Sequence, residues 1–267
     1  MNINDLIRGT DEKPLDQLIA DGGFCSIFRT IGCVGDSLSS GEFESINDAG
    51  SKHYHDMYEY SWVQYMARTL GSTVYNFSRG GMTAKEYCES FAQENGFWEK
   101  DKACQAYVIA LGVNDIVNNN TPVGNSFSDV DYADYHKNNL ETFAGYYGML
   151  ISKLKEISPD AKFFFMTMPV YENESSELAE RKNAHAALLY KLAERFSNSY
   201  VLDFRKYAPV YDFEFRKLFF LGGHMNACGY ILTAKMVMSY IDYIIRHNMK
   251  DFREVPFIGT EYKYTLF

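Results

Sequence analysis

A serine that follows a short apolar run is the residue of this chain best placed for nucleophilic chemistry. The run Thr30-Ile31-Gly32-Cys33-Val34 leads directly into Gly35-Asp36-Ser37-Leu38. An apolar run that ends at a glycine and a small polar residue predicts a buried strand feeding a tight turn. A serine hydroxyl attacks only when a base takes its proton and donors stabilise the oxyanion. If Ser37 is a nucleophile, the rest of the chain must therefore supply a histidine and N–H groups.

Three later segments carry such groups. They are Asn76-Phe77-Ser78-Arg79-Gly80-Gly81, Gly112-Val113-Asn114-Asp115 and Gly222-Gly223-His224-Met225-Asn226. Taken singly, each segment is typical of an ordinary loop, because glycines readily adopt positive φ and an Asn-Asp pair is common in turns. In an open parallel sheet, however, sites form outside the carboxyl ends of the strands. The segments would meet at one edge if the chain forms such a sheet.

Strand-like runs recur along the chain and alternate with helix-length segments. The runs span residues 30–34, 73–77, 106–111, 162–168 and 200–204. Several read as continuous apolar blocks, which is typical of strands that are buried on both faces. The alternation predicts an α/β fold with about five parallel strands covered by helices.

Two of the intervening segments have clear helical periodicity. Ala184, Leu188, Leu192 and Phe196 share one face in the first segment. The second carries the apolar stripe Ile231, Ala234, Met238, Ile241 and Ile245, with Asn226 as its N-cap and His247-Asn248 near its end. We expect residues 42–60 and 121–132 to be loops that wall a pocket.

The composition favours one folded domain over residues 1–267, with a lead-in at 1–28 and an aromatic tail at 250–267. Hydrophobic residues make up 46% and charged residues 23%, close to ordinary globular usage. The net charge of -9 would repel phosphate backbones and anionic membrane surfaces. We therefore expect neither a nucleic acid nor a membrane as partner.

The cysteines and the N-terminus indicate a reducing compartment. Five scattered cysteines without a C-x-x-C pair suggest neither a disulfide framework nor a zinc site. The first residues, Met1-Asn2-Ile3-Asn4-Asp5, include an acid and do not begin an apolar core of signal-peptide length. No later window approaches the ~18 uninterrupted apolar residues that a membrane-spanning helix needs. The cytoplasm is the expected location. The cluster His53-Tyr54-His55-Asp56 has no obvious third ligand, so no metal is expected.

The order of the four segments resembles that of the SGNH, or GDSL-type, hydrolase superfamily. The resemblance covers roughly residues 28–248, and Gly112-Val113-Asn114-Asp115 together with Gly35-Asp36-Ser37-Leu38 is its most specific part. It implies a flavodoxin-like, three-layer α/β/α domain, esterase or acylhydrolase chemistry, and no metal or other cofactor.

The resemblance also implies a role for each matching position. Ser37 would be the nucleophile, and His224 the general base that later protonates the leaving alcohol. The backbone N–H groups of Ser37 and Gly81 and the side-chain amide of Asn114 would form the oxyanion hole. Gly80 would replace Gly81 if the loop register differs by one.

One position departs from the family pattern. The family has an aspartate three residues before the histidine, where this chain has Leu221. A backbone carbonyl near Leu221 or Gly222 could orient His224 in a Ser-His dyad, which is the preferred interpretation. Alternatively, a carboxylate from elsewhere substitutes, with Asp212 and Asp203 as the nearest upstream candidates.

Three functions remain open at this level. The first is a serine esterase acting on a small-acyl or carbohydrate-linked ester through an acyl-serine intermediate. The second is a ligand-binding protein of the same fold that has lost catalysis, and the third is a thioesterase or lipase. Exposed Tyr54, Tyr58, Tyr60, Trp62 or Trp98 rings could stack on sugars. An α/β-hydrolase is disfavoured because Ser37 lies early and outside a Gly-x-Ser-x-Gly elbow.

Overall fold

The central element is a parallel sheet whose strands lie in the order β4-β1-β5-β6-β7. The computed structural model describes residues 7, 9, 11–134 and 139–264. The strands are β1 (Thr30–Gly35), β4 (Thr73–Ser78), β5 (Ala106–Ala110), β6 (Lys162–Met166) and β7 (Ser199–Leu202). The predicted five-stranded parallel sheet is confirmed, and each predicted run overlaps one of these strands.

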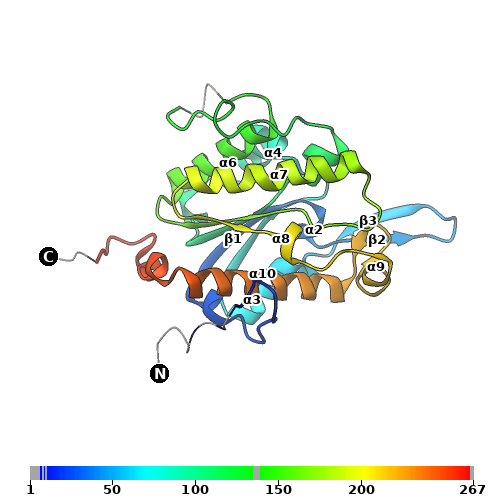
Figure 1. Cartoon of the computed structure of the whole chain (residues 1–267), viewed down its shortest axis with the longest axis horizontal. Coiled ribbons are helices and arrows are strands. Elements are labelled where there is room, and N and C mark those ends of the chain that lie inside the picture. The colour runs from blue at the N-terminus through cyan, green and yellow to red at the C-terminus, as the bar shows by residue number, and fades with distance from the viewer. Residues whose placement is uncertain (1–6, 8, 10, 135–138, 265–267) are drawn as a thin grey trace.

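Helices cover both faces of the sheet (Figure 1). One face carries α6 (Phe143–Ile157) and α7 (Ser176–Arg195), and the other carries α3 (Trp62–Leu70) and α10 (Ala227–His247). Val108 and Phe164 lie in the core beside α10, whereas Ile109 and Phe165 lie in the core beside α6 and α7. Strands buried on both faces explain why these blocks are continuously apolar.

The two periodic segments are helices, and each has one residue of its predicted apolar face exposed to solvent. In α10, Asn226 caps the N-terminus by accepting a hydrogen bond from the Gly229 N–H at 2.9 Å, as predicted. Ile231 lies at the exposed margin of the α10 stripe. In α7, Ala184 is exposed because the buried face passes through His185 instead.

The remaining segments are short. They comprise α2 (Ser37–Ser40), α4 (Ala84–Glu86), α5 (Ala92–Glu94), α8 (Phe204–Tyr207), α9 (Phe213–Phe219), the 3-10 helices η1 (Gly23–Ile27), η2 (Tyr58–Tyr60), η4 (Lys100–Lys102), η6 (Met249–Phe252) and η7 (Val255–Phe257), and the π-helical turns η3 (Tyr87–Phe91) and η5 (Val113–Asn118). Within the described parts of the chain, every helix is too short or too polar to cross a membrane.

Two small antiparallel pairs lie outside the main sheet. The expected loop at 42–60 contains the hairpin β2 (Glu42–Ile46) and β3 (Lys52–Asp56), which projects beyond the body of the molecule (Figure 1). The second pair is β8 (Phe220–Leu221) and β9 (His224–Met225), and β2 lies against it. The hairpin is thus a structural neighbour of the segment that carries His224.

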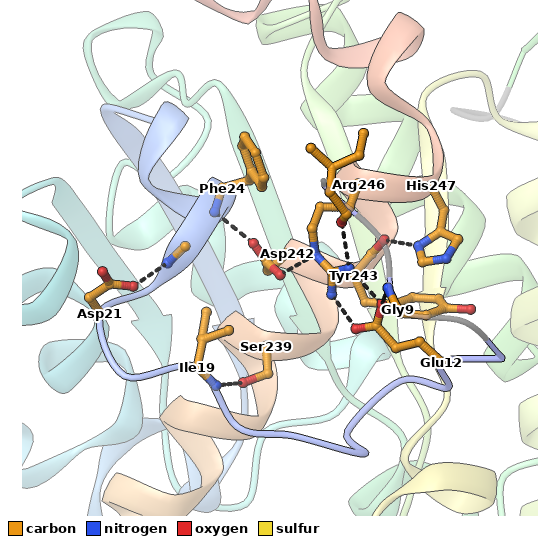
Figure 2. A network of polar contacts seen from close by, with 12 residues as sticks. Gly9, Glu12, Ile19, Asp21, Phe24, Ser239, Asp242, Tyr243, Arg246 and His247 are labelled. Atoms are coloured by element: carbon orange, nitrogen blue, oxygen red, sulfur yellow. Dashed lines mark hydrogen bonds and ion pairs between the residues drawn. The ribbon is translucent and has the colours of Figure 1, made fainter. Parts of the chain in front are cut away.

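The acidic lead-in is fixed to α10 by a polar network (Figure 2). Arg246 pairs with Asp242 at 2.7 Å and with Glu12 at 2.5 Å, and the Phe24 N–H donates to Asp242 at 2.7 Å. The hydrogen bond to Arg246 lowers the pKa of the Glu12 carboxyl. In the C-terminal tail, Phe252 is buried, whereas Phe267 lies outside the described residues.

Arg246→Met is expected to lower the free energy of unfolding by about 2 kcal/mol, because the buried Asp242 carboxylate loses its charged partner. Urea unfolding measures the change. Arg253→Met, which removes an exposed arginine, is the matched control and should unfold like the wild type. Equal stability of the two variants would show that the network adds nothing to the fold.

Candidate active site

Ser37 begins the short helix α2 at the carboxyl end of strand β1. Asp36 is the N-cap of α2, and its Oδ1 accepts a hydrogen bond from the Leu38 N–H at 3.1 Å. A side chain at Gly35 would collide with the Ser39 side chain, so the turn requires a glycine there. The predicted strand, turn and helix start at Ser37 are confirmed.

Asp36 is a buried acid that caps α2, the helix that begins at Ser37. Burial raises its pKa to about 7, and the nearby Asp115 charge adds to the increase. The carboxyl ionises near pH 4 in the unfolded chain, so the native state binds the extra proton between about pH 4 and 7. Native stability therefore falls as the pH rises through this window.

Asp36→Asn is expected to stabilise the protein by about 2 kcal/mol at pH 8, with the gain disappearing near pH 4. Asparagine keeps an acceptor for the Leu38 N–H but carries no charge to desolvate. Thermal unfolding at both pH values measures the effect. A gain that is the same at pH 4 and pH 8 would argue against a buried ionisation at this position.

His224 lies on β9, and β9 packs beside α2, which starts at Ser37. The structure contains no hydrogen bond between the Ser37 hydroxyl and His224; both belong to the described residues. Instead, His224 Nε2 lies 3.0 Å from Glu42 Oε1, and its Nδ1 lies 4.0 Å from Glu44 Oε2. Two carboxylates of the hairpin strand β2 therefore flank the imidazole.

Glu44 is held as an anion on the Nδ1 side of His224. Its side chain is 4% exposed, pairs with Lys52 at 2.6 Å, and accepts the Gly223 N–H at 3.0 Å. These two contacts lower the pKa of the Glu44 carboxyl. A fixed negative charge beside an imidazole stabilises its protonated form.

Glu42 lies on the Nε2 side, between His224 and the loop at Gly80. Its side chain is 15% exposed, and a side chain at Gly80 would collide with its Oε2. Burial raises the pKa of the Glu42 carboxyl, the His224 charge opposes this increase, and Asp56 adds to it. His224 Nε2, the nitrogen that could accept a proton from a serine hydroxyl, therefore has a carboxylate partner in this structure.

The loops after β4 and β5 carry the two remaining predicted donors. Gly81 has φ of 73°, which favours glycine, and the space where its side chain would point is open. The Asn114 amide donates to the Met82 carbonyl at 3.1 Å, which leaves its second N–H available. Asp115 accepts the Ala84 N–H at 2.9 Å, so the two loops are joined.

Gly112 sets the position of the loop that carries Asn114. Its φ is 137°, and a Cβ there would lie 2.7 Å from Nε2 of the fully buried His185. Burial lowers the pKa of His185 to about 4, so this imidazole is neutral near pH 7. The packing of Gly112 on His185 requires a residue without a side chain.

The sequence-based candidates for orienting His224 need correction. Asp212 caps α9 by accepting the Phe215 N–H at 2.8 Å, and Asp203 accepts from Thr167 at 3.0 Å and Tyr190 at 2.9 Å. His224 Nδ1 has no hydrogen-bond partner, which also contradicts a carbonyl acceptor near Leu221 or Gly222. The carboxylate nearest to this nitrogen belongs to Glu44.

Sequence reasoning missed Glu42 and Glu44. They stand two residues apart in β2, directly after the helix of Ser37, so both side chains point to the same face of the strand. The alternation of side chains along β2 shows that the two glutamates share a face, but it does not reveal that His224, about 180 residues later, lies against that face.

The histidines of the hairpin form hydrogen bonds within the hairpin, His55 with Ser45 at 2.8 Å and His53 with Asn47 at 3.0 Å. Among the described residues, no group of three or more ligands could hold a metal ion.

The sequence model of the GDSL-like lipase/acylhydrolase family matches residues 33–232, a range that contains Ser37, Gly81, Asn114 and His224. The chain belongs to this family. The GDSL-type family hydrolyses esters, and this chain is assigned to the same class of enzyme. No curated protein matches the sequence.

Several solved structures share the fold of this GDSL-like chain. The acetyl xylan esterase AlAXEase is 19% identical with a TM-score of 0.51, and the match covers 79% of this chain and 99% of that one. Esterase EstA from Pseudoalteromonas sp. is 15% identical (TM-score 0.54; 81% and 98% covered). A family two carbohydrate esterase from Clostridium thermocellum, in complex with cellohexaose, is 16% identical (TM-score 0.53). The match covers 84% of this chain and 65% of that protein. These similarities confirm the three-layer hydrolase fold.

Proposed function

We propose that this GDSL-type chain is a serine esterase that cleaves a small-acyl or carbohydrate-linked ester through an acyl-serine intermediate. The observation that carries the proposal is the packing of α2, which begins at Ser37, beside β9, which carries His224. The two segments are far apart in the sequence and meet outside the carboxyl ends of the strands, where sites of such sheets form.

In the acylation step, Ser37 Oγ attacks the ester carbonyl while His224 Nε2 takes the hydroxyl proton. The imidazole must exchange its Glu42 contact for the serine hydroxyl before this step. The carbonyl oxygen becomes an oxyanion, which the N–H groups of Ser37, Gly81 and the Asn114 side chain would stabilise. Collapse breaks the ester bond, and His224 returns the proton to the departing alcohol.

Deacylation repeats the sequence with water as the nucleophile. His224 takes a proton from the water as its oxygen attacks the acyl-serine carbonyl, and the same donors hold the second oxyanion. Cleavage of the acyl bond returns the proton to Ser37 Oγ and releases a carboxylic acid.

Glu44 would take the place of the aspartate that the family has three residues before the histidine, where this chain has Leu221. It lies on the Nδ1 side of His224 at 4.0 Å, is nearly inaccessible to solvent, and is kept anionic by Lys52 and the Gly223 N–H. An anion there stabilises the imidazolium that forms during each proton transfer. A modest rotation of the imidazole toward Glu44 would release Nε2 from Glu42 and close the Nδ1 contact.

A sugar-linked alcohol is favoured by the exposed tyrosine beside the histidine. Tyr54 on β3 is 55% exposed, and its ring centroid lies 5.6 Å from that of His224. Aromatic faces present apolar area beside a polar tip, which suits a sugar ring. Trp62 is buried in the core and is unavailable for such stacking. The solved carbohydrate esterases of this fold point in the same direction.

The test is pre-steady-state release of p-nitrophenol from p-nitrophenyl acetate. We expect a burst of about one equivalent and an intact-mass increase of one acetyl group, because deacylation follows a covalent intermediate. Purified protein without burst or turnover would contradict the proposal. The Glu42 contact on Nε2 favours, as a second candidate, ligand binding without catalysis. Saturable binding of an acetylated oligosaccharide by protein that gives no burst would support that candidate.

A further inference from the structure

A cleft of about 370 Å³ lies between the amino ends of β6 and β7 and the C-terminal segment. Its lining includes Lys162, the first residue of β6, Asn198, which precedes β7, and several residues between 250 and 263. We call it the tail cleft. The C-terminal segment lies at the end of the molecule opposite to the hairpin of β2 and β3 (Figure 1). The volume of the tail cleft is within the range of small-molecule sites.

The tail cleft has equal numbers of positive and negative side chains in its lining. They are Lys162, Lys250, Lys263, Asp160, Asp251 and Glu254. All six are described residues, and no ion pair joins any of them to another. A simple cation or anion in the cleft would therefore meet as many like charges as opposite ones. The charges favour an uncharged ligand whose polar groups both donate and accept hydrogen bonds.

Lys162 supplies a buried hydrogen-bond donor to the tail cleft. The residue is 7% exposed, and its Nζ donates to Asn198 Oδ1 at 2.6 Å and lies 5.6 Å from the centre of the Phe252 ring. Burial lowers the pKa of the Lys162 ammonium, and the Asp251 charge opposes this decrease. An ammonium has three N–H donors, and two of them have no protein acceptor in the described part of the chain. Buried donors of this kind favour a ligand that brings acceptor oxygens.

The other walls of the tail cleft supply acceptors and aromatic rings. Asp251 Oδ2 accepts the Tyr200 hydroxyl at 3.0 Å, which leaves its Oδ1 for a ligand. Phe257 and Tyr262 also line the cleft, and Tyr262 is 64% exposed. Aromatic rings present apolar area to a ligand beside such polar groups. The lining thus suits a molecule that has hydroxyl groups at its edge and an apolar face.

We propose that the tail cleft binds an uncharged sugar unit of an oligosaccharide, at a second site separate from the active site. A sugar hydroxyl accepts from an ammonium and donates to a carboxylate, so it can bridge charges that lie too far apart to pair. The C–H faces of a sugar ring suit Phe257 and Tyr262. Because β6 is five residues long, its amino end is about 15 Å from the carboxyl edge that carries the active site. The inference goes beyond the proposed esterase function and does not depend on it.

The experiment is isothermal titration calorimetry of the full chain with cellohexaose, xylohexaose, mannohexaose and the anionic hexagalacturonate. We expect saturable binding of at least one neutral oligosaccharide. Lys162→Met should weaken that binding on the order of tenfold, because it keeps the apolar stem and removes charged donors. Tyr262→Ala should weaken it about fivefold, because a ring face is lost. Tyr264→Ala is the matched control, since it removes an exposed tyrosine outside the lining and should bind like the wild type.

Three results would overturn the tail cleft as a sugar site. They are no binding of any neutral oligosaccharide, tighter binding of hexagalacturonate than of the neutral ones, and binding that Lys162→Met and Tyr262→Ala leave unchanged. Loss of binding only in Tyr54→Ala would place the sugar beside His224 and likewise exclude the tail cleft. If Lys162→Met does not fold, the exposed Tyr262→Ala still decides.

Failure of this inference differs from failure of the proposed function. Lys162→Met and Tyr262→Ala leave every proposed catalytic residue in place, so both should give the wild-type burst with p-nitrophenyl acetate. Protein that gives the burst but binds no oligosaccharide retains the esterase function and loses the sugar site. Protein that binds through the tail cleft but gives no burst retains the sugar site and loses the esterase function.

Discussion

Ser37→Ala is expected to lower kcat for ester hydrolysis by about 10⁴-fold, because no other hydroxyl can form the acyl intermediate at this position. The remaining activity would come from substrate binding and the oxyanion donors. Initial rates with p-nitrophenyl acetate measure the loss, and circular dichroism verifies that the variant folds. The burst should disappear together with turnover.

Ser40→Ala is the matched control on the same short helix. Its hydroxyl lies 2.7 Å from Asp56 Oδ1 and 3.2 Å from the Ser37 backbone carbonyl, so the substitution removes a serine of α2 and leaves the Ser37 hydroxyl in place. We expect activity within a few-fold of the wild type. Wild-type turnover by purified Ser37→Ala would exclude Ser37 as the nucleophile.

Glu44→Gln is expected to lower kcat on the order of 100-fold with little change in KM. Glutamine keeps the size of the side chain and an acceptor for the Gly223 N–H, but it removes the charge that would stabilise the His224 imidazolium. That charge matters only when the proton moves, so substrate binding is unaffected. Steady-state kinetics with p-nitrophenyl acetate separates kcat from KM.

Lys52→Met distinguishes this role from a structural one. Both substitutions break the 2.6 Å pair between Lys52 and Glu44, but only Glu44→Gln removes the carboxylate beside His224. We expect similar melting temperatures for the two variants and near-wild-type kcat for Lys52→Met. An equal loss of kcat in both variants would mean that the pair only supports the hairpin.

The sheet and the serine turn could be predicted from local patterns. Strands such as β5 and β6 are buried on both faces and therefore read as unbroken apolar blocks. The turn at Gly35 must accommodate Ser39 at close range, which explains the glycine before Asp36 and Ser37. In each case the cause of the structure lies within a few residues of the feature that it produces.

The surroundings of His224 could not be predicted in the same way. Asp203 and Asp212 are the nearest aspartates upstream of His224, but both use their oxygens on neighbouring groups, at Tyr190 and at the N-terminus of α9. Glu44 reaches the histidine because β2 of the hairpin packs on β8 and β9. A contact made by packing of distant segments leaves no periodicity or spacing in the sequence.

Labelling with a fluorophosphonate probe tests the central claim most directly, because the probe reacts only with a serine that a neighbouring base activates. Peptide mass spectrometry should find the probe on Ser37 in the wild type, and His224→Ala should lose most of the labelling while remaining folded. An esterase-active protein that is labelled elsewhere, or on Ser37 equally well without His224, would contradict the pairing of these two residues.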